Sequence, residues 1–352
     1  MIMVTNARNP LRADPTRTAT LRRVFSSDVT RRLKRVRKKL LKIIVDEDAL
    51  GLRKSTTRNQ LSTNARWKFR SAAKQVDAFR AWVEKELQKE LIGVTAKNIE
   101  RAYWKQYIEQ SYKKGVGRSF DDLRKPALAD QDRVRDFYEG TKDEFLRSAF
   151  RRPVAVEKVK ILASRVYTDL KGVTEDAATR MTRTLTDGLI QGHNPRKIGK
   201  DLAEVLDGVS KNRAVTIART EVIRAHAEGQ LDSLELQGED KVGVMVEWST
   251  AGDTRVCPLC SELEKVVLKI SEARGLLPRH PNCRCAYLPA NVGEKKRGQI
   301  RGKRDIQKQL DASVRKESPK SKRSLREQKK RSNWAGADLT PSKVRPKSPL
   351  EK

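Results

Sequence analysis

The sequence predicts a mainly α-helical protein: an elongated helical region over residues 26–207, then a small α+β module over residues 208–290, with disordered basic termini at residues 1–25 and 291–352. Three observations lead to this expectation. Apolar residues recur at helical spacing through most of the helical region, they alternate as in a strand around residues 242–248, and they become scarce at both ends. Apolar residues make up 37% and aromatic residues 5% of the chain, which favours long solvated helices over one compact core.

The first ordered element is expected to be a basic amphipathic helix. Residues 1–25 are rich in Arg, contain Pro10 and Pro15 and have no sustained period, so we expect them to be disordered or draped over a partner. The helix is expected from Ser27, with Asp28 near its N-cap. Its apolar stripe has helical spacing and consists of Val29, Leu33, Val36, Leu40, Ile43 and Ile44.

Further helices are expected at about 66–92, 96–113 and 129–150, where apolar residues again repeat with the period of a helix. Pro153 separates them from a third helical group, roughly residues 155–207. Within that group, residues 192–195 should end one helix and start the next, because Pro suits the first turn of a helix and Gly the turn before it. The sequence therefore predicts a helical hairpin there.

The pattern changes after Gly208. A helix over about 210–237 should be followed by a strand, because Val242, Val244, Val246 and Trp248 alternate. A cysteine segment with Pro, Gly and Asn turns comes next. These features predict a small mixed domain.

The net charge of +32 is concentrated at the two ends. Residues 1–45 hold thirteen Lys and Arg against two acidic residues, and residues 291–352 hold twenty against seven, so 24 of the 32 charges lie there. Such ends are typical of polycationic arms that bind double-stranded DNA non-specifically through its phosphates. The alternatives are solubilising tails or arms for an acidic protein surface.

The sequence offers no apolar run of the roughly 20 residues that a membrane span requires, and no apolar signal core near its beginning. We therefore expect no membrane partner and a protein that is made and kept in a cytosol. Its four cysteines all lie within residues 257–285 and would stay reduced there. Clustered reduced thiols indicate a metal before a disulfide.

Two short turns each offer a pair of metal ligands. Cys257 and Cys260 flank Pro258 at a position that its fixed φ favours, and His280 and Cys283 form a similar turn. The separation of the two pairs is common in zinc sites, and tetrahedral zinc accepts both thiolate and imidazole. We therefore predict a structural zinc site.

Cys285 provides a fifth candidate ligand for four positions. The matching turns favour Cys257, Cys260, His280 and Cys283, whereas an all-sulfur site would replace His280 with Cys285. Either set closes the coordination sphere and leaves no position for an activated water, so the metal should stabilise the fold. Four thiols without a metal are the alternative.

We expect no enzyme, no catalytic residue and no small-molecule substrate. His193 lies in an inter-helix turn and His226 on a helix, and neither accompanies a nucleophile motif. The sequence contains no Gly-rich phosphate loop, and the scattered acidic residues follow ordinary helical patterns.

The segment from Ala218 to Pro289 resembles the phage Mu protein F-like family of head morphogenesis (minor head, or minor capsid) proteins. The resemblance covers about a fifth of the chain. It rests on an ordered set of residues: Arg219, Thr220, Glu221, Trp248, Asp253, Arg255, Cys257, Pro258, Cys260, His280, Pro281, Asn282, Cys283, Arg284 and Cys285.

The resemblance implies a virion protein present in few copies, at the portal vertex or inner head, that is made in the bacterial host cytoplasm and contacts portal or inner capsid proteins. Arg219 and Glu221 lie two apart on a helix, so we expect them to tie that helix to different neighbours. Asp253 should accept hydrogen bonds from the ligand turn or pair with Arg255.

Two other classes of function remain open at this point. One is a nuclease or toxin-like effector carried in the head, although residues after 290 have the composition of a tail. The other is a cellular zinc-containing nucleic-acid-binding protein. The ligand spacing is unlike that of a finger whose helix enters a groove, and the sequence lacks the interleaving of aromatic residues that single-strand stacking requires.

Overall fold

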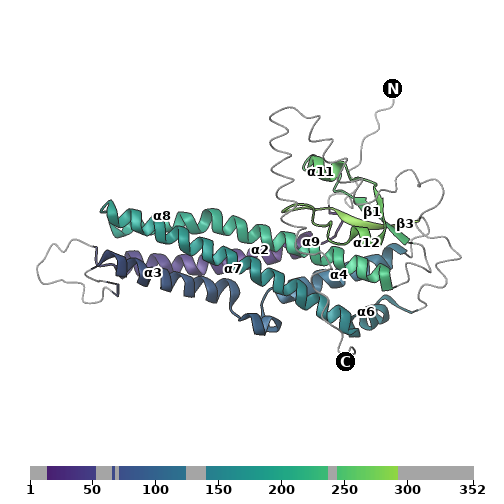
Figure 1. The fold of residues 1–352 in the computed structure, drawn as a ribbon, viewed down its shortest axis with the longest axis horizontal. Helices are drawn as coiled ribbons and strands as arrows, with labels where there is room; N and C mark the ends of the chain where they lie inside the picture. The colour runs from purple at the N-terminus through teal and green to yellow at the C-terminus, as the bar shows by residue number, and fades with distance from the viewer. Residues whose placement is uncertain (1–13, 53–65, 68–70, 124–139, 237–243, 292–352) are drawn as a thin grey trace, which may run out of the picture. The chain divides into compact units, whose positions relative to one another are not determined.

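The structure is a computed structural model that describes residues 14–52, 66–67, 71–123, 140–236 and 244–291. It is mainly helical, with a small sheet in its C-terminal part (Figure 1). The chain forms two compact units built from interleaved segments: Met1–Arg22, Tyr107–Val159 and Arg219–Lys352 in unit 1, and Arg23–Gln106 and Lys160–Ala218 in unit 2. Neither unit is a single continuous stretch of the sequence, because long helices contribute residues to both.

Unit 2 is built around helix α2 (Ala19–Leu41), whose apolar stripe is buried as its spacing predicts. A π-helical turn, η1 (Lys42–Asp46), continues it and buries Ile43 and Ile44. Helix α3 (Ala72–Leu87) and its π-helical end η2 (Gln88–Ile92) lie alongside α2 in Figure 1, joined to it by ion pairs of Arg35 and Lys39 with Glu86 and Glu90.

Helix α2 begins eight residues before the expected start at Ser27. The Asp14 carboxylate accepts a hydrogen bond of 2.7 Å from the Ala19 amide, and the buried hydroxyls of Thr16 and Thr18 lie 2.7 Å apart. These local bonds satisfy polar groups at the helix start and order the chain from Asp14. The expectation of disorder through residue 25 is therefore wrong for residues 14–25, while residues 1–13 lie outside the described chain.

Other helix boundaries also differ from the expected ones. The segment expected over 96–113 is a 3-10 helix, η3 (Ala96–Arg101), followed by α4 (Lys105–Leu123). The segment expected over 129–150 lies partly outside the described residues, and its visible part is α6 (Lys142–Arg151). A reciprocal pair of hydrogen bonds between Thr141 and Glu144 starts α6.

The helical hairpin is present where the sequence predicts it. Helix α7 (Pro153–Ile190) ends before Gly192, which has φ of +65°, and α8 (Pro195–Val205) then begins. The Asn194 side chain caps α8 by accepting a hydrogen bond of 2.9 Å from the Lys197 amide. A π-helical turn, η4 (Leu206–Ser210), joins α8 to α9 (Lys211–Leu236).

In unit 1, α4 and α9 cross with their backbones in contact. A Cβ added at Gly115 would lie 2.1 Å from the carbonyl oxygen of His226, and one added at Gly229 would lie 2.3 Å from that of Tyr112. Only glycine fits at such a crossing. The Ser111 hydroxyl reinforces the contact by donating a hydrogen bond of 2.6 Å to the Val222 carbonyl.

The sheet of unit 1 has three antiparallel strands in the order β2-β1-β3, namely β2 (Val267–Leu268), β1 (Val244–Ser249) and β3 (Ala286–Asn291). Trp248 is fully buried and pairs in register with Tyr287. Short helices α11 (Pro258–Ser261) and α12 (Ile270–Ala273) lie between the strands in sequence. The core of this module joins apolar side chains of β1, β3 and α9 with the buried cysteines.

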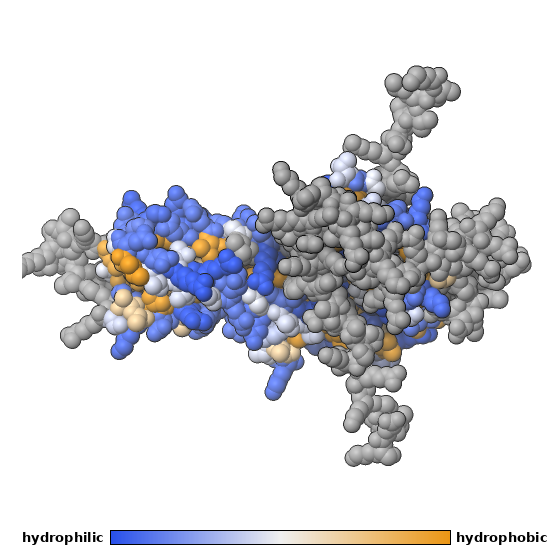
Figure 2. Space-filling model, turned by 45° about the horizontal axis from the view of Figure 1, so that its top comes forward, coloured by the Kyte–Doolittle hydropathy of each residue, from blue (hydrophilic) through white to orange (hydrophobic). Residues whose placement is uncertain are grey.

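Hydrophilic residues cover most of the coloured surface on the face drawn in Figure 2. Among the described large apolar side chains, Val154 and Ile190 are the most exposed. The described helices include none with the length and apolar character that a membrane crossing requires.

Candidate metal centre

The first ligand turn begins at Cys257. Cys257 has an extended backbone and stands at the N-cap of α11, with Pro258 in the first helical position. Its carbonyl accepts hydrogen bonds from the amides of Cys260 (3.0 Å) and Ser261 (2.9 Å). This single turn places the half-buried Cys257 sulfur and the buried Cys260 sulfur on the same side.

The second ligand turn contains His280 and Cys283. The Cys283 amide donates a hydrogen bond of 3.1 Å to the His280 carbonyl, and Asn282 has φ of +61°, the left-handed conformation that an Asn at this position tolerates. Nδ1 of His280 lies 2.9 Å from the Pro281 carbonyl oxygen. Because that oxygen only accepts, Nδ1 must donate, so Nε2 directs its lone pair at the cysteines once it has lost its proton.

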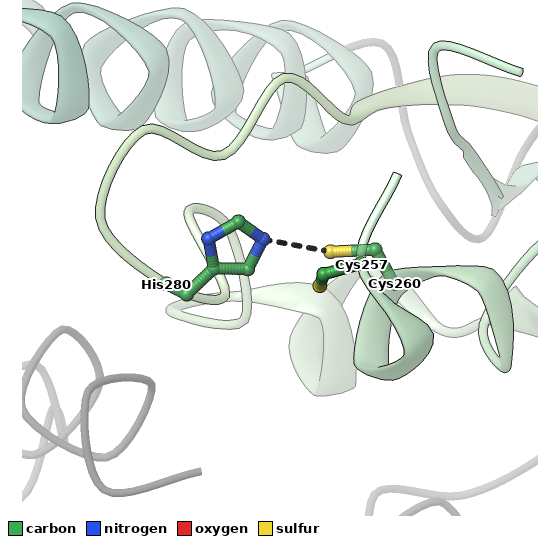
Figure 3. A group of neighbouring side chains, drawn as sticks. All are labelled: Cys257, Cys260 and His280. Carbon is green, nitrogen blue, oxygen red and sulfur yellow. Dashed lines mark hydrogen bonds between the residues drawn. The ribbon is translucent and has the colours of Figure 1, made fainter. Parts of the chain in front are cut away.

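The five candidate ligands come together in two overlapping groups that share Cys260. The ligand atoms of Cys257, Cys260 and His280 lie within 4.8 Å of one another, as do those of Cys260, Cys283 and Cys285. Figure 3 shows His280 turned toward the Cys257 and Cys260 side chains. Neither group alone contains four of the ligands proposed from the sequence, so the choice between the two ligand sets stays a prediction.

Two separations, both measured from Cys260, fit a tetrahedral metal. Cys260 Sγ lies 3.3 Å from His280 Nε2 and 4.0 Å from Cys283 Sγ. Zinc bonds of about 2.3 Å to sulfur and about 2.0 Å to nitrogen place ligands at tetrahedral angles about 3.5 Å apart for sulfur and nitrogen and about 3.8 Å apart for two sulfurs. The soft thiolates and the imidazole suit the same ion, so the residues present fit zinc.

The pKa values of the cluster residues also favour binding of a cation. Hydrogen bonding to Cys260 lowers the pKa of the Cys257 thiol to about 5, although burial opposes this change. Hydrogen bonding to Cys257 in turn raises the pKa of Cys260, so one thiolate holds a proton on its neighbour. Burial lowers the pKa of His280, but its hydrogen bond to Cys257 and the charge of Cys283 raise it to about 9. A bound divalent cation would replace these shared protons and hold the sulfurs as thiolates.

Asp253 connects the two halves of the cluster. It precedes Cys257 by four residues and accepts two hydrogen bonds of 2.6 Å from Arg284, which lies between Cys283 and Cys285. The exposed Arg255 also pairs with Asp253, at 3.1 Å. The hydrogen bonds from Arg284 hold the pKa of Asp253 well below its usual range.

Helix α9 supports the second turn through Thr220, a residue of the family resemblance to which the sequence assigned no role. Its hydroxyl accepts a hydrogen bond of 3.1 Å from the Asn282 amide. Arg219 is exposed, whereas Glu221 is buried and pairs at 3.2 Å with the buried Arg224. This ion pair lies within α9, and the expected tie of Glu221 to a neighbouring element stays a prediction. The spacing of three residues between Glu221 and Arg224 is the signal that could have found this ion pair.

Trp248 belongs to the core beneath the cluster. Its ring packs edge-on against Tyr287 with centroids 5.9 Å apart, and the Tyr287 hydroxyl donates a hydrogen bond of 2.7 Å to the Ala273 carbonyl. The two other histidines belong to neither ligand group: His193 precedes α8, and His226 is fully buried on α9. Burial lowers the pKa of His226 to about 3, so its imidazole is neutral at physiological pH.

The fold and cluster define a helical protein with a small, cysteine-rich α+β module. Residues 179–288 match the family described as phage Mu protein F like protein. The match agrees with the resemblance found in the sequence, and it begins earlier, within α7, than the segment from Ala218 that the motifs alone indicate. No curated protein and no solved structure matches the chain significantly.

Proposed function

We propose that the protein is a minor structural component of a tailed-phage head that acts in head morphogenesis near the portal vertex. The observation that carries this proposal is the family match over residues 179–288. In this role the protein is made in the host cytoplasm, contacts portal or inner capsid proteins and becomes part of the virion. Its basic termini contact packaged double-stranded DNA without reading base sequence.

The metal has a structural role in this proposal. Five ligand groups within the cluster outnumber the four positions of tetrahedral zinc, so the protein can fill the coordination sphere without water. A closed site stabilises a small domain whose sheet includes a strand of only two residues. We therefore propose that the protein is not an enzyme and that it acts by binding other virion proteins and DNA.

Mass spectrometry of purified particles tests this proposal. Full heads, emptied heads and tailless assembly intermediates are digested, and peptides of this chain are quantified against the major capsid protein. We expect a few copies per particle in all three samples. Absence from both the assembly intermediates and the finished heads would contradict the proposal, and presence only in the soluble host fraction would favour a cellular nucleic-acid-binding protein.

A further inference from the structure

Unit 2 contains a groove lined mainly by cationic side chains. It has a volume of about 680 Å³ and lies where η1 and the end of α2 meet η4 and the start of α9. Its lining residues are Lys34, Arg37, Lys38, Leu41, Lys42, Asp46, Asp207 and Lys211. Five cations face two carboxylates, and only one lining residue is apolar.

The cations of α2 have different partners on its two sides. Toward α3, Arg35 and Lys39 are neutralised by the carboxylates of Glu86 and Glu90, at distances of 2.6 to 3.2 Å. In the groove, Arg37 pairs with Asp207 at 2.7 Å, which links α2 to η4.

Three groove lysines keep their charge unpaired. Within the described part of the chain, Lys34, Lys38 and Lys211 form no ion pair, and Lys34 and Lys38 are exposed. Lys34 and Lys38 lie four residues apart on one face of α2, about 6 Å along the helix axis. The groove thus presents a short row of free ammonium groups on a rigid helix.

From this arrangement we infer that the groove is a second, structured binding site for the phosphate backbone of duplex DNA. Ammonium groups are point donors that neutralise phosphates without requiring a fixed geometry, which suits binding that ignores base sequence. Leu41 is the one apolar residue among those that line the groove. The inference deepens the proposed DNA contact, which otherwise rests on the terminal arms.

The experiment measures binding of the full chain to a random-sequence duplex over a range of salt concentrations. The test variant combines Lys34→Gln, Lys38→Gln and Lys211→Gln. A matched control combines Lys74→Gln, Lys85→Gln and Lys89→Gln, three exposed lysines of α3 and η2 in the same unit. Both variants lose the same net charge, and Gln preserves helix propensity.

We expect the groove variant to have a shallower salt dependence than wild type, by about 0.9 for each phosphate that is no longer neutralised and so by about 2.7 for three. The control should keep the wild-type slope. Equal slopes for the two variants would overturn the groove while leaving the terminal arms as the DNA contact. A wild-type chain that binds no duplex would overturn both, while the virion assignment would still be decided by particle composition.

A second measurement places the contact without any substitution. Lysines of the wild-type chain are acetylated with and without bound duplex, and modified peptides are quantified by mass spectrometry. Lys34, Lys38 and Lys211 should be protected by DNA, and Lys74, Lys85 and Lys89 should not. Protection by an acidic polyglutamate peptide but not by DNA would overturn the inference in favour of a protein partner.

Discussion

Both oxygens of the Asp253 carboxylate accept hydrogen bonds of 2.6 Å from the two terminal nitrogens of Arg284. The pair is 31 residues apart in sequence and connects the segment before Cys257 with the residue between Cys283 and Cys285. A bidentate pair fixes orientation as well as distance. It therefore links the segment that leads into the first ligand turn with the end of the second.

Replacing Asp253 with Asn should weaken the module at neutral pH. Because the folded-state pKa of Asp253 is depressed by Arg284, its contribution is present above the unfolded-state value of about 3.9 and is lost as the pH falls. We expect a loss of about 1 kcal/mol for this partly exposed pair, measured by denaturant unfolding at pH 7. Arg255→Gln, at the more exposed partner, is the control and should cost less. Equal losses of stability in the two variants would show that the Asp253–Arg284 pair adds nothing beyond the Asp253–Arg255 pair.

The full chain should contain close to one equivalent of zinc when it is purified without chelators. The five candidate ligands form two groups that share Cys260, and the small module has little apolar area with which to hold itself together. Elemental analysis gives the stoichiometry, and removal of the metal should unfold residues of the module as seen by hydrogen exchange. A metal-free chain with full protection there would refute a structural zinc site.

Single substitutions should then identify the four ligands. With the set Cys257, Cys260, His280 and Cys283, the variants Cys257→Ser and Cys283→Ser should release the metal and unfold the module, while Cys285→Ser should do less. Competition with a zinc-binding dye measures the affinity of each variant. If Cys285→Ser is more damaging than His280→Ala, the site is all-cysteine.

The crossing of α4 and α9 predicts a large cost for a single methyl group. In Gly115→Ala the new Cβ would meet the His226 carbonyl at 2.1 Å, so the helices must separate. We expect a loss of about 3 kcal/mol or more in the free energy of unfolding, at the upper end of overpacking effects. Gly208→Ala is the control, because nothing lies within 4 Å of its added Cβ, and it should be neutral or stabilising. A stable Gly115→Ala protein would mean that the two helices are not in backbone contact.

The sequence predicts the features of this fold that depend on local pattern. The stripe of α2, the break between helices at residues 192–195 and the two ligand turns follow from helical periodicity and from the dihedral preferences of Pro, Gly and Asn. Local pattern misses the start of α2, because hydrogen bonds of Asp14 and its neighbours order a segment whose prolines and arginines indicate disorder.

Features that depend on tertiary contact could not be predicted in this way. Strand β3 contains Pro289, which argues against a strand, yet β3 lies at an edge of the sheet where a missing amide is tolerated. No spacing rule pairs Asp253 with Arg284 or Thr220 with Asn282. The ligand choice stays open for a chemical reason, since five suitable donors crowd around Cys260.

Deletion of residues 291–352 should separate the contribution of the C-terminal arm to DNA binding from that of the rest of the chain. This segment holds twenty Lys and Arg against seven acidic residues, so it should contact several phosphates and release their counterions. The truncated chain should bind duplex DNA more weakly and with a flatter salt dependence, by about 0.9 for each phosphate that the arm neutralises. Its zinc content should not change, because all five candidate ligands precede residue 291. Binding to duplexes of unrelated sequence should fall equally, and an unchanged salt slope would instead assign the arm to a protein partner.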